Sequence, residues 1–526
     1  MKIKPLLIFA VAVVLFVSMY NLRKNRCLNG FVFWIVFGVI NLWSGSVAKI
    51  NAQTFEGIQN SNFAGVHSVY SNPALLTSMA YKRHANISTL GFEVNNNMFA
   101  ITAPFTLWQA ITGNVPAQYQ NANGKVYWQK DFLKQQPIGT SGWGSVSAEY
   151  RGPAYANRIG KRFVWSTHSR TRTQVSVRNV SAGLLDYGRI LFDTSMRGKN
   201  GNLDQRSSLP FSFQANAYQE LGASLAAAIV DSKKLKISIG GTAKYLMGLG
   251  HYSIVSEGMQ LRTFGRDSIQ FMQSNVQVSY SETQVFKRIM SGLIGGLPSF
   301  RNIMGHGIGF DLGFTVEGGK GGGTAQMKER WLGDPTARNY HWRLAASVTD
   351  FGKLSYGSQV NTFSFSNVTP VTLKTDSAFF GAFQQGGSAG YTYLEEFAKK
   401  SMNYKQETGT MRFVLPTQLH VQGDLRIMAG FYTAFHWQQS LHSLKSVGFR
   451  QPSSLIVIPR IETKWLEVSM PVGLTNDYRK GNIGACVRVG PVFVGSDNFL
   501  SNMMSNNIKG MNVYFGLSSS IGKIKK

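Results

Sequence analysis

Short runs of alternating apolar and polar residues recur along this chain. Between Gly307 and Val316, five apolar side chains fall on one face of an extended strand, while three glycines, an aspartate and a threonine fall on the other. A period of two is typical of a strand with one apolar and one polar face. The same pattern occurs in the runs Leu221–Ile229, Leu235–Tyr245, Leu466–Leu474, Ile483–Val489 and Val513–Leu517. The chain is therefore predicted to be rich in two-faced strands.

Turns can be placed between some of these runs. The polar tetrapeptide Asp231-Ser232-Lys233-Lys234 separates two of them and predicts a hairpin. The alternation from Gln418 to Trp437 is longer than one strand needs, so we expect a tight turn inside it, near Gly423-Asp424 or Arg426.

Strands of this kind, behind a secretory leader and with no later helix of membrane length, are the signature of a transmembrane β-barrel. Composition agrees, since the chain has 55 glycines and 12% aromatic residues, and its mean hydropathy is -0.10. We predict an all-β, transmembrane antiparallel β-barrel of about 14 strands, within a range of ~12 to 16, with long irregular loops. A soluble sandwich or propeller is the alternative, although no fixed-period repeat supports a propeller.

Two apolar segments, Pro5–Tyr20 and Phe31–Trp43, precede the first predicted strand. The second follows a basic region and is followed by small residues, which is the anatomy of a signal peptide. We predict a leader over residues 1–52, with the signal peptide at 19–52 and cleavage after Ala48 or Ala52. Residues 1–18 are then an over-extended gene start. An inner-membrane anchor of two helices is the competing interpretation, but both segments are shorter than the ~20 residues of a span.

The cysteine count and the net charge limit the possible disulfides and binding partners. Cys27 lies in the leader, so the mature chain keeps only Cys486 and cannot form an intramolecular disulfide. The leader holds six bases and no acid, which leaves 48 bases against 26 acids and a net charge of +22. Nucleic acid is a poor partner for an exported barrel, so we expect contact with acidic outer-membrane lipid and lipopolysaccharide, or a lumen that attracts anions.

Several charged residues fall on the polar faces of the predicted strands. Arg170 and Arg172 share a face and would point into the lumen or, near a strand end, toward lipid head groups. The candidate lumen or ligand residues are Asp311, Arg488, Lys236, Lys244, Arg170 and Arg172.

Segments without alternation are predicted to be loops or plugs. They are 106–157, 184–209, 281–305 and 318–339. Tyr391–Met402 is instead predicted to be helical, because Glu395 and Glu396 each precede a lysine by four residues.

The stretch just after the leader carries a family resemblance. Asn60–Leu76, which contains Asn72-Pro73-Ala74, resembles the mature N-terminus of an uncharacterised, domain-of-unknown-function family of Bacteroidota outer-membrane barrels. Its Asn-Pro-Ala core is also similar to FadL-type channels for hydrophobic compounds and to PorV-type barrels of the type IX secretion system. Asn72 can cap a short helix that begins at Pro73, where a missing N–H costs nothing. By resemblance, this element is a hatch inside the barrel.

A second stretch near the C-terminus matches the end of the same uncharacterised family. It consists of Arg488–Leu500, with Arg-x-Gly-Pro and Gly-Ser-Asp-Asn, followed by Gly510–Leu517. The resemblance spans residues 53 to 520, and it implies a hatch-like segment at 53–85 and a barrel at 86–526.

The sequence offers little for catalysis. His420 and Asp424 share a strand face, but four residues of strand span roughly 13 Å, which is too far for a base and its orienter. His436 and His442 lie near Trp437 in a predicted loop, and no metal-binding spacing accompanies them. We expect no enzyme activity, no metal and no cofactor.

The predicted function is a channel or carrier, in the outer membrane of a Gram-negative bacterium, for a small hydrophobic or anionic molecule. The alternative is a PorV-like binding or assembly module for secreted or surface proteins, without transport activity. An outer-membrane hydrolase is a third and weaker possibility.

Overall fold

The computed structural model describes residues 55–120, 126, 129–137, 141–185, 204–205, 211–232, 234–264, 267–282, 303–319, 340–384, 389–428, 430–441 and 450–522. The predicted leader and its cleavage sites lie outside these residues, as do most of the loops predicted at 184–209, 281–305 and 318–339. Residues 105–120 belong to a small unit of their own. In it, Thr106 and Gln109 form a capping box for α4 (Leu107–Thr112), and η3 (Ala117–Tyr119) follows.

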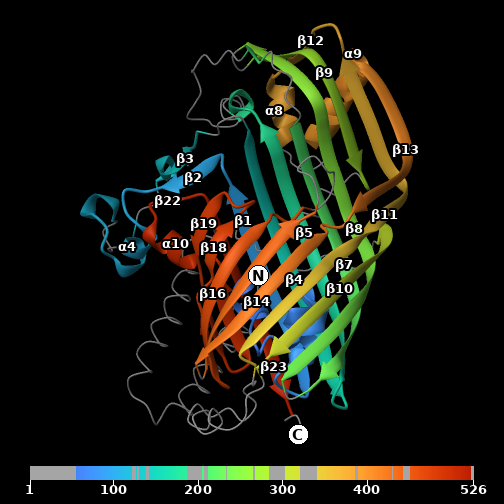
Figure 1. Cartoon of the computed structure of the whole chain (residues 1–526). Helices are drawn as coiled ribbons and strands as arrows, with labels where there is room; N and C mark the ends of the chain where they lie inside the picture. Colours follow the sequence, from blue (N-terminus) through green and yellow to red (C-terminus); the bar gives the residue numbers. More distant parts are fainter. Residues whose placement is uncertain are drawn as a thin grey trace. The chain divides into compact units, whose positions relative to one another are not determined.

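The large unit is built around one antiparallel sheet that closes on itself (Figure 1). Its last strand returns to its first, with Ile521 opposite Arg83. In chain order the strands are β1 (Arg83–Asn96), β4 (Gly142–Ile159), β5 (Phe163–Val180), β7 (Phe211–Asp231), β8 (Leu235–Phe264), β9 (Ser268–Tyr280), β10 (Gly305–Gly318), β11 (Trp342–Asn367), β12 (Val371–Lys374), β13 (Asn403–Val414), β14 (Gln418–Met428), β15 (Phe431–Ser440), β16 (Ser454–Glu462), β17 (Leu466–Ser469), β18 (Val472–Thr475), β19 (Lys480–Ile483), β20 (Ala485–Val489), β21 (Val492–Ser496) and β23 (Gly510–Ile521).

Several of these strands are segments of one interrupted strand. The pairs are β9 with β10, β11 with β12, β13 with β14, β17 with β18, and β19 with β20, because both members of each pair lie along the same neighbour. The described sheet has 20 strands; joining these five pairs and setting aside the two-residue β6 (Asp204–Gln205) leaves 14 wall strands. This agrees with the predicted barrel of about 14 strands.

The side chains of the wall alternate as the sequence predicts. In β10, Ile308, Phe310 and Leu312 are 57%, 46% and 70% exposed, whereas the intervening Asp311 is 2% exposed. Because such an outward face is apolar on strand after strand, it suits a hydrocarbon surrounding, and ring closure pairs the backbone groups that lipid could not satisfy. The barrel is of the transmembrane kind.

Three local expectations differ from the structure. The turn inside 418–437 lies at Gly430, whose φ is 74°, while Gly423 and Asp424 sit within β14. The run 466–474 breaks after Ser469, because Pro471 has no N–H for the ladder. The predicted loop 106–157 ends earlier, since β4 begins at Gly142 and a long two-faced strand follows.

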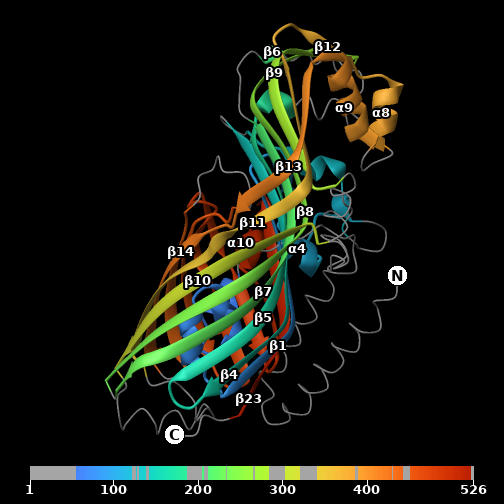
Figure 2. The same ribbon diagram turned by 90° about the vertical axis from the view of Figure 1, so that its right-hand side faces the viewer.

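A compact N-terminal segment fills the ring, and we call residues 55–80 the hatch. It contains α3 (Glu56–Gln59), η1 (Gly65–Tyr70) and η2 (Pro73–Ser78), and every one of its residues is buried (Figure 2). As predicted, the Asn72 side chain caps η2 by accepting from the Ala74 N–H at 2.9 Å. Gly240 and Gly313 of the wall let this turn approach closely, since a Cβ at either position would collide with it.

The two ends of the barrel differ. At the end where β1 begins and β23 finishes, the turns are short, such as 232–234 and 463–465. At the other end the connections are long, and β8, β9, β11 and β13 continue beyond their neighbours as an extension of the sheet. Two helices, α8 (Ser377–Gln384) and α9 (Ala389–Ser401), pack there.

Helix α9 confirms the helix predicted at 391–402, and its Glu395 and Lys399 form an ion pair at 2.7 Å. A small sheet joins β22 (Asn507–Ile508), β2 (Phe99–Thr102) and β3 (Leu133–Gln135), with η4 (Lys130–Phe132) and α10 (Phe499–Met504) in the same region of the chain's fold. Among the described helices, none combines the length and the apolar character that crossing a bilayer would require.

Candidate functional site in the barrel lumen

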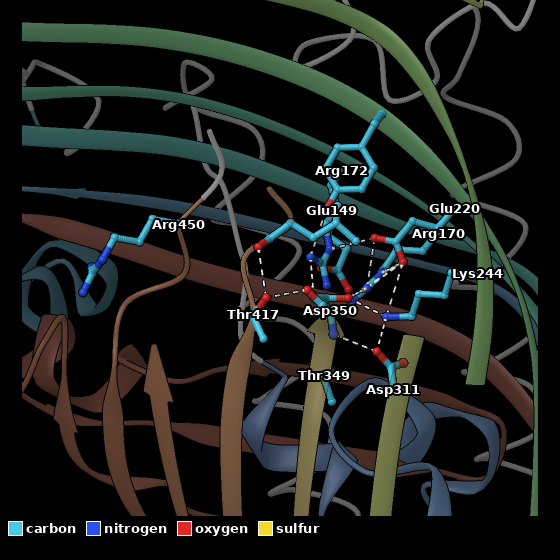
Figure 3. A network of polar contacts seen from close by, with 12 residues as sticks. Glu149, Arg170, Arg172, Glu220, Lys244, Asp311, Thr349, Asp350, Thr417 and Arg450 are labelled. Atoms are coloured by element: carbon cyan, nitrogen blue, oxygen red, sulfur yellow. Dashed lines mark hydrogen bonds and ion pairs between the residues drawn. The ribbon is translucent and has the colours of Figure 1, made fainter. Parts of the chain in front are cut away.

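Eight charged side chains form a continuous network on the inner wall of the barrel, which we call the belt (Figure 3). They come from six consecutive wall strands. The members are Glu149 and Arg151 on β4, Arg170 and Arg172 on β5, Glu220 on β7, Lys244 on β8, Asp311 on β10 and Asp350 on β11. The alternation of each strand turns these residues inward, because their outward neighbours are apolar or small.

Three of the four carboxylates of the belt, those of Glu149, Glu220 and Asp350, each pair with more than one base. Glu220 accepts two hydrogen bonds from the Arg170 Nη2 group, at 2.7 and 3.0 Å. Asp350 accepts from Arg170 at 3.1 Å and pairs with Arg172 at 2.7 Å. These shared contacts link β5 and β7 to β11, which is not their ladder neighbour, through side chains, and charge-assisted hydrogen bonds of this kind are the strong ones.

Asp350 holds an unusual backbone position. Its φ is 55°, in the left-handed region, and its N–H donates to Asp311 Oδ1 at 2.7 Å. Lys244 Nζ lies 2.7 Å from the same Asp311 carboxylate. The register of β10 against β11 shifts at this point. A bulge therefore aims both the main chain and the side chain of Asp350 into the belt.

Four bases face four acids in the belt, so its formal charge is zero. All eight side chains are buried. Removing charges from water is costly, and it is tolerated here because each charge has partners at hydrogen-bond distance. The belt brings together four of the predicted lumen residues, and it places Arg170 and Arg172 inside the ring instead of at a lipid-facing rim. None of these charges is left to attract an anion by itself.

The other two predicted lumen residues hold the hatch. Lys236 Nζ donates to the Thr77 carbonyl at 2.8 Å and lies 3.4 Å from Glu317. Arg488 donates to Glu467 at 2.9 Å, and its guanidinium lies over the ring of Phe63, 4.4 Å from the centroid. Both bases therefore contact hatch residues directly, and neither belongs to the belt.

A second charged group fastens the first half of the hatch. Asp424 accepts from Arg343 at 2.8 Å and from Arg460 at 2.6 Å. Glu462 accepts two hydrogen bonds from the hatch residue Asn62, one from its backbone N–H at 3.1 Å and one from its side-chain amide at 2.8 Å. The first half of the hatch is therefore held in the lumen by polar contacts with side chains of the wall.

Four residues, one from the hatch and three from different wall strands, form a hydrogen-bonded chain. His436 lies in β15, not in a loop, and its Nδ1 is 2.7 Å from Glu56 Oε2 of the hatch. Its Nε2 is 3.0 Å from His420 Nδ1, and His420 Nε2 is 2.9 Å from Thr349 Oγ1. Two neutral imidazoles with Nδ1–H satisfy every link. As the spacing predicted, His420 and Asp424 share no contact; their partners lie on other strands.

The hatch also carries titratable groups of its own. Burial, the nearby Arg151 cation and His84 hold the pKa of His67 well below its usual 6.5. Burial raises the pKa of Tyr70 to about 12. The Tyr70 ring lies beneath two belt guanidiniums, 4.2 Å from Arg151 and 4.9 Å from Arg170. Cation–π contact therefore joins the hatch to the belt.

An apolar and aromatic layer lies on the long-loop side of the belt. It contains Tyr218, Leu246, Leu354, Tyr356, Val360, Phe413 and Leu415, all buried. Tyr218 precedes Glu220 by two positions, and Leu246 and Leu354 follow Lys244 and Asp350 by two and four positions. Because β7 runs antiparallel to its neighbours, all three lie on the same side of the belt, so the layer directly abuts it. Arg172 donates to the Tyr218 hydroxyl at 3.1 Å, which joins the two. Within the described residues, no cluster of His, Cys, Asp or Glu is arranged to hold a metal ion.

The sequence reasoning missed half of the belt. Glu220 and Glu149 sit on the polar faces of alternating strands, and that signal could have found them. Asp350 could not be found this way, because the bulge in its strand changes the face to which it points.

The chain resembles several solved structures at low identity. The toluene transporter TbuX of Ralstonia pickettii matches with 10% identity and a TM-score of 0.39, over 90% of this chain and 99% of that one. A TodX monoaromatic hydrocarbon channel mutant matches with 8% identity and 0.39, over 90% and 96%. A Pseudomonas aeruginosa FadL homologue matches with 9% identity and 0.23, over 90% and 99%.

Among curated proteins no sequence matches the chain. One family model matches residues 73–497, from the first residue of η2 to the residue after β21, and so covers the belt and most of the wall. That family is described as one of unknown function, DUF5723, and this chain belongs to it.

Proposed function

We propose that this protein is a channel or carrier in the outer membrane of a Gram-negative bacterium, that its cargo is a small hydrophobic molecule, and that the hatch is its removable plug. Short turns lie at the hatch end and long connections at the other. In outer-membrane barrels the short turns are periplasmic. The extension then stands on the cell surface, where acidic lipopolysaccharide is the expected neighbour of this basic chain.

The charge balance of the lumen carries the choice of cargo. The belt is neutral, and the layer beside it is apolar and aromatic. A passing anion would find no uncompensated cation in the belt and would lose water against the aromatic layer. A neutral hydrophobic molecule would gain from the same layer. Of the two cargo classes expected from the sequence, the structure therefore favours the hydrophobic one.

The hatch is suited to movement because it is attached by side chains. Among the described residues no ladder pairing joins the hatch to the wall. The seat consists of polar contacts such as Thr77 Oγ1 to Ser238 Oγ at 2.8 Å and Asn72 Nδ2 to the Ala346 carbonyl at 3.2 Å. Side-chain contacts can break one after another, whereas a strand pair must be unzipped.

A tethered hatch tests this proposal. Cysteines in place of Thr77 and Ser238 lie where two hydroxyls already touch, and a disulfide between them would lock the hatch. In proteoliposomes, uptake of a neutral aromatic compound should stop on oxidation and return on reduction, and an organic anion of similar size should enter poorly throughout. The single variant Thr77→Cys is the control. Equal uptake in the oxidised and reduced protein would contradict a moving hatch.

One observation favours the alternative, a binding or assembly module. Among the described strands, β13 pairs with β11 alone, and residues 405–410 of β13 are exposed on both faces. An unpaired strand edge can accept an extended segment of another protein. Two results together would favour partner binding over a channel. The purified barrel would transport neither compound, and a single protein would copurify with it but be lost when Thr408→Pro disrupts that edge.

A further inference from the structure

We propose that residues 450–453, which we call the strap, form a second gate on the long-loop side of the lumen, latched by the ion pair of Arg450 with Asp477. This inference rests on the proposed channel function and concerns its regulation. The hatch would close one end of the path and the strap the other.

The strap crosses the barrel. It leads into β16 at Ser454, while Gln174 of β5 donates its side-chain amide to the Arg450 carbonyl at 3.3 Å. In the ring of 14 wall strands, β5 is third and β16 tenth, so seven steps separate them in either direction. They are opposite walls. Gln174 follows the belt residue Arg172 by two positions on the same inner face, which places the strap just above the belt.

The latch is a two-point ion pair. Arg450 Nη1 and Nη2 donate to the two Asp477 oxygens at 2.9 and 2.7 Å. The same carboxylate accepts from the Ser453 N–H at 3.0 Å, and the Asp477 N–H donates to the Ser453 carbonyl at 2.9 Å. Asp477 therefore contacts both ends of the strap. Burial opposes the charge, yet these hydrogen bonds and Arg450 keep the pKa of Asp477 below its usual value.

The turn that supplies Asp477 is strained. Asn476, Asp477 and Tyr478 have φ values of 55°, 55° and 64°, three consecutive residues in the left-handed region. Residues other than glycine rarely adopt this conformation, because the Cβ atom crowds the backbone, and Asn and Asp tolerate it best. Tyr478 is held by its hydroxyl, which accepts from Trp437 Nε1 at 2.7 Å and donates to Gln439 at 2.6 Å. A strained segment persists only while its surroundings hold it, so releasing the latch allows the turn to relax.

The two ends of the strap are held in different ways. At the Arg450 end, the side chain forms the latch with Asp477 and the carbonyl accepts the Gln174 bond, while Arg178 on the same strand as Gln174 repels Arg450 electrostatically. At the β16 end, Ser453 Oγ also accepts from the Ser440 N–H at 3.1 Å. The strap is thus continuous with the wall at β16, whereas the latch is a side-chain ion pair that can open. Once it opens, the strap can swing about its attachment at β16, which is the arrangement of a flap.

The latch is tested first by a readout that does not involve transport. Ser453→Cys places a thiol at a position that is 2% exposed, in a Cys486→Ser background. Reaction with a membrane-impermeant maleimide should be slow in this protein and about tenfold faster when Asp477→Asn removes the charge. Asn also accepts the left-handed backbone, so the turn itself is spared. Glu407→Gln, on the exposed strand β13, is the matched charge-removing control and should leave the rate unchanged.

Arg450→Gln separates a latch from a general loss of structure. If the two side chains act as a pair, Arg450→Gln, Asp477→Asn and the double variant should raise the labelling rate by the same factor, because breaking the pair once is enough. Additive effects, or labelling that is already fast in the parent, would overturn the latch. Loss of the folded, heat-modifiable band on gels would mark a variant as misfolded; Arg450→Lys then supplies the milder break, with an intermediate rate expected.

Transport is measured on the same variants. Uptake of the neutral aromatic compound should rise with the labelling rate when the hatch is free, and should stay blocked when the oxidised Thr77→Cys, Ser238→Cys tether is present. If labelling responds but uptake never occurs, the channel function fails while the latch stands. If uptake is hatch-dependent but labelling and uptake ignore Asp477, the channel stands and the strap is not its gate.

Discussion

The hatch region and the extension of this barrel are stabilised in opposite ways. Around the hatch, the buried side chains of the wall mostly carry a charge or a hydroxyl group, as in the belt and in the cluster of Asp424, Arg343 and Arg460. In the extension, the buried residues form apolar clusters, one with Val276, Val278 and Phe363 and another with Leu261 and Phe379. The same strand β8 contributes to both regions, as Figure 2 shows.

The difference follows from what each face of the strand meets. In the barrel, the apolar face meets lipid, so the polar face is left to bind the hatch. In the extension, the apolar face is covered by α8 and α9, where Phe379, Phe380, Tyr393 and Phe397 pack. One alternating pattern therefore produces a polar interior in one part and an apolar core in the other, depending on the partner of the apolar face.

The largest effect should come from breaking the belt. Glu220→Ala removes the main carboxylate partner of the buried Arg170. We expect the free energy of unfolding to fall by about 3–5 kcal/mol, as for other broken buried ion pairs. Guanidinium unfolding in detergent micelles measures it. Glu407→Ala, which breaks an exposed pair with Lys405, is the control and should have no measurable effect. Equal stability of the two variants would mean that the belt contributes nothing.

An apolar truncation should act locally in the extension. Phe379→Ala opens a cavity among Leu261, Ile269 and Leu373, and a loss of about 3 kcal/mol is expected for a buried phenylalanine. Hydrogen exchange should accelerate in α8 and at the tip of β8 while the hatch stays protected. Spread of the acceleration into residues 55–80 would contradict the separation of the two regions.

The cap of the hatch should matter less. Asn72→Ala removes the bond to the Ala74 N–H and two bonds to wall carbonyls, and we expect a loss of about 1–2 kcal/mol in hatch stability. Limited proteolysis of the N-terminal segment reports it. Asn507→Ala, at an exposed position of β22, serves as the control. An unchanged cleavage rate would show that neither the cap nor these two wall bonds hold η2 in place.

Acid should loosen the hatch through His67, with the smallest effect. The folded protein keeps this imidazole neutral, whereas the unfolded chain binds a proton below the usual pKa of 6.5. Stability is therefore full above that pH and falls as pH drops, by roughly 1 kcal/mol per unit for this one group. His67→Phe should remove that share of the pH dependence between pH 6.5 and 5. Identical pH profiles for the two proteins would refute it.

Much of the architecture was determined by the sequence alone. Alternation in runs such as 307–316 fixed which side chains of each strand face outward, and Asn72-Pro73 fixed the start of η2. These are local properties: the period of two belongs to any extended strand, and a cap needs only its own turn. For the same reason the helix at 389–401 was visible from its ion-pair spacing.

The tertiary structure decided what the inward faces do. Lys244 and Asp311 are predicted from the sequence to face the lumen, and Arg170 to face the lumen or lipid head groups, but only ring closure brings all three together with Glu220 and Asp350 into a neutral belt. His436 meets Glu56 although 380 positions separate them in the chain. Which charges cancel depends on bulges and on closure of the whole ring, since a one-residue shift in register moves a side chain to the opposite face. Alternation carries no information about either.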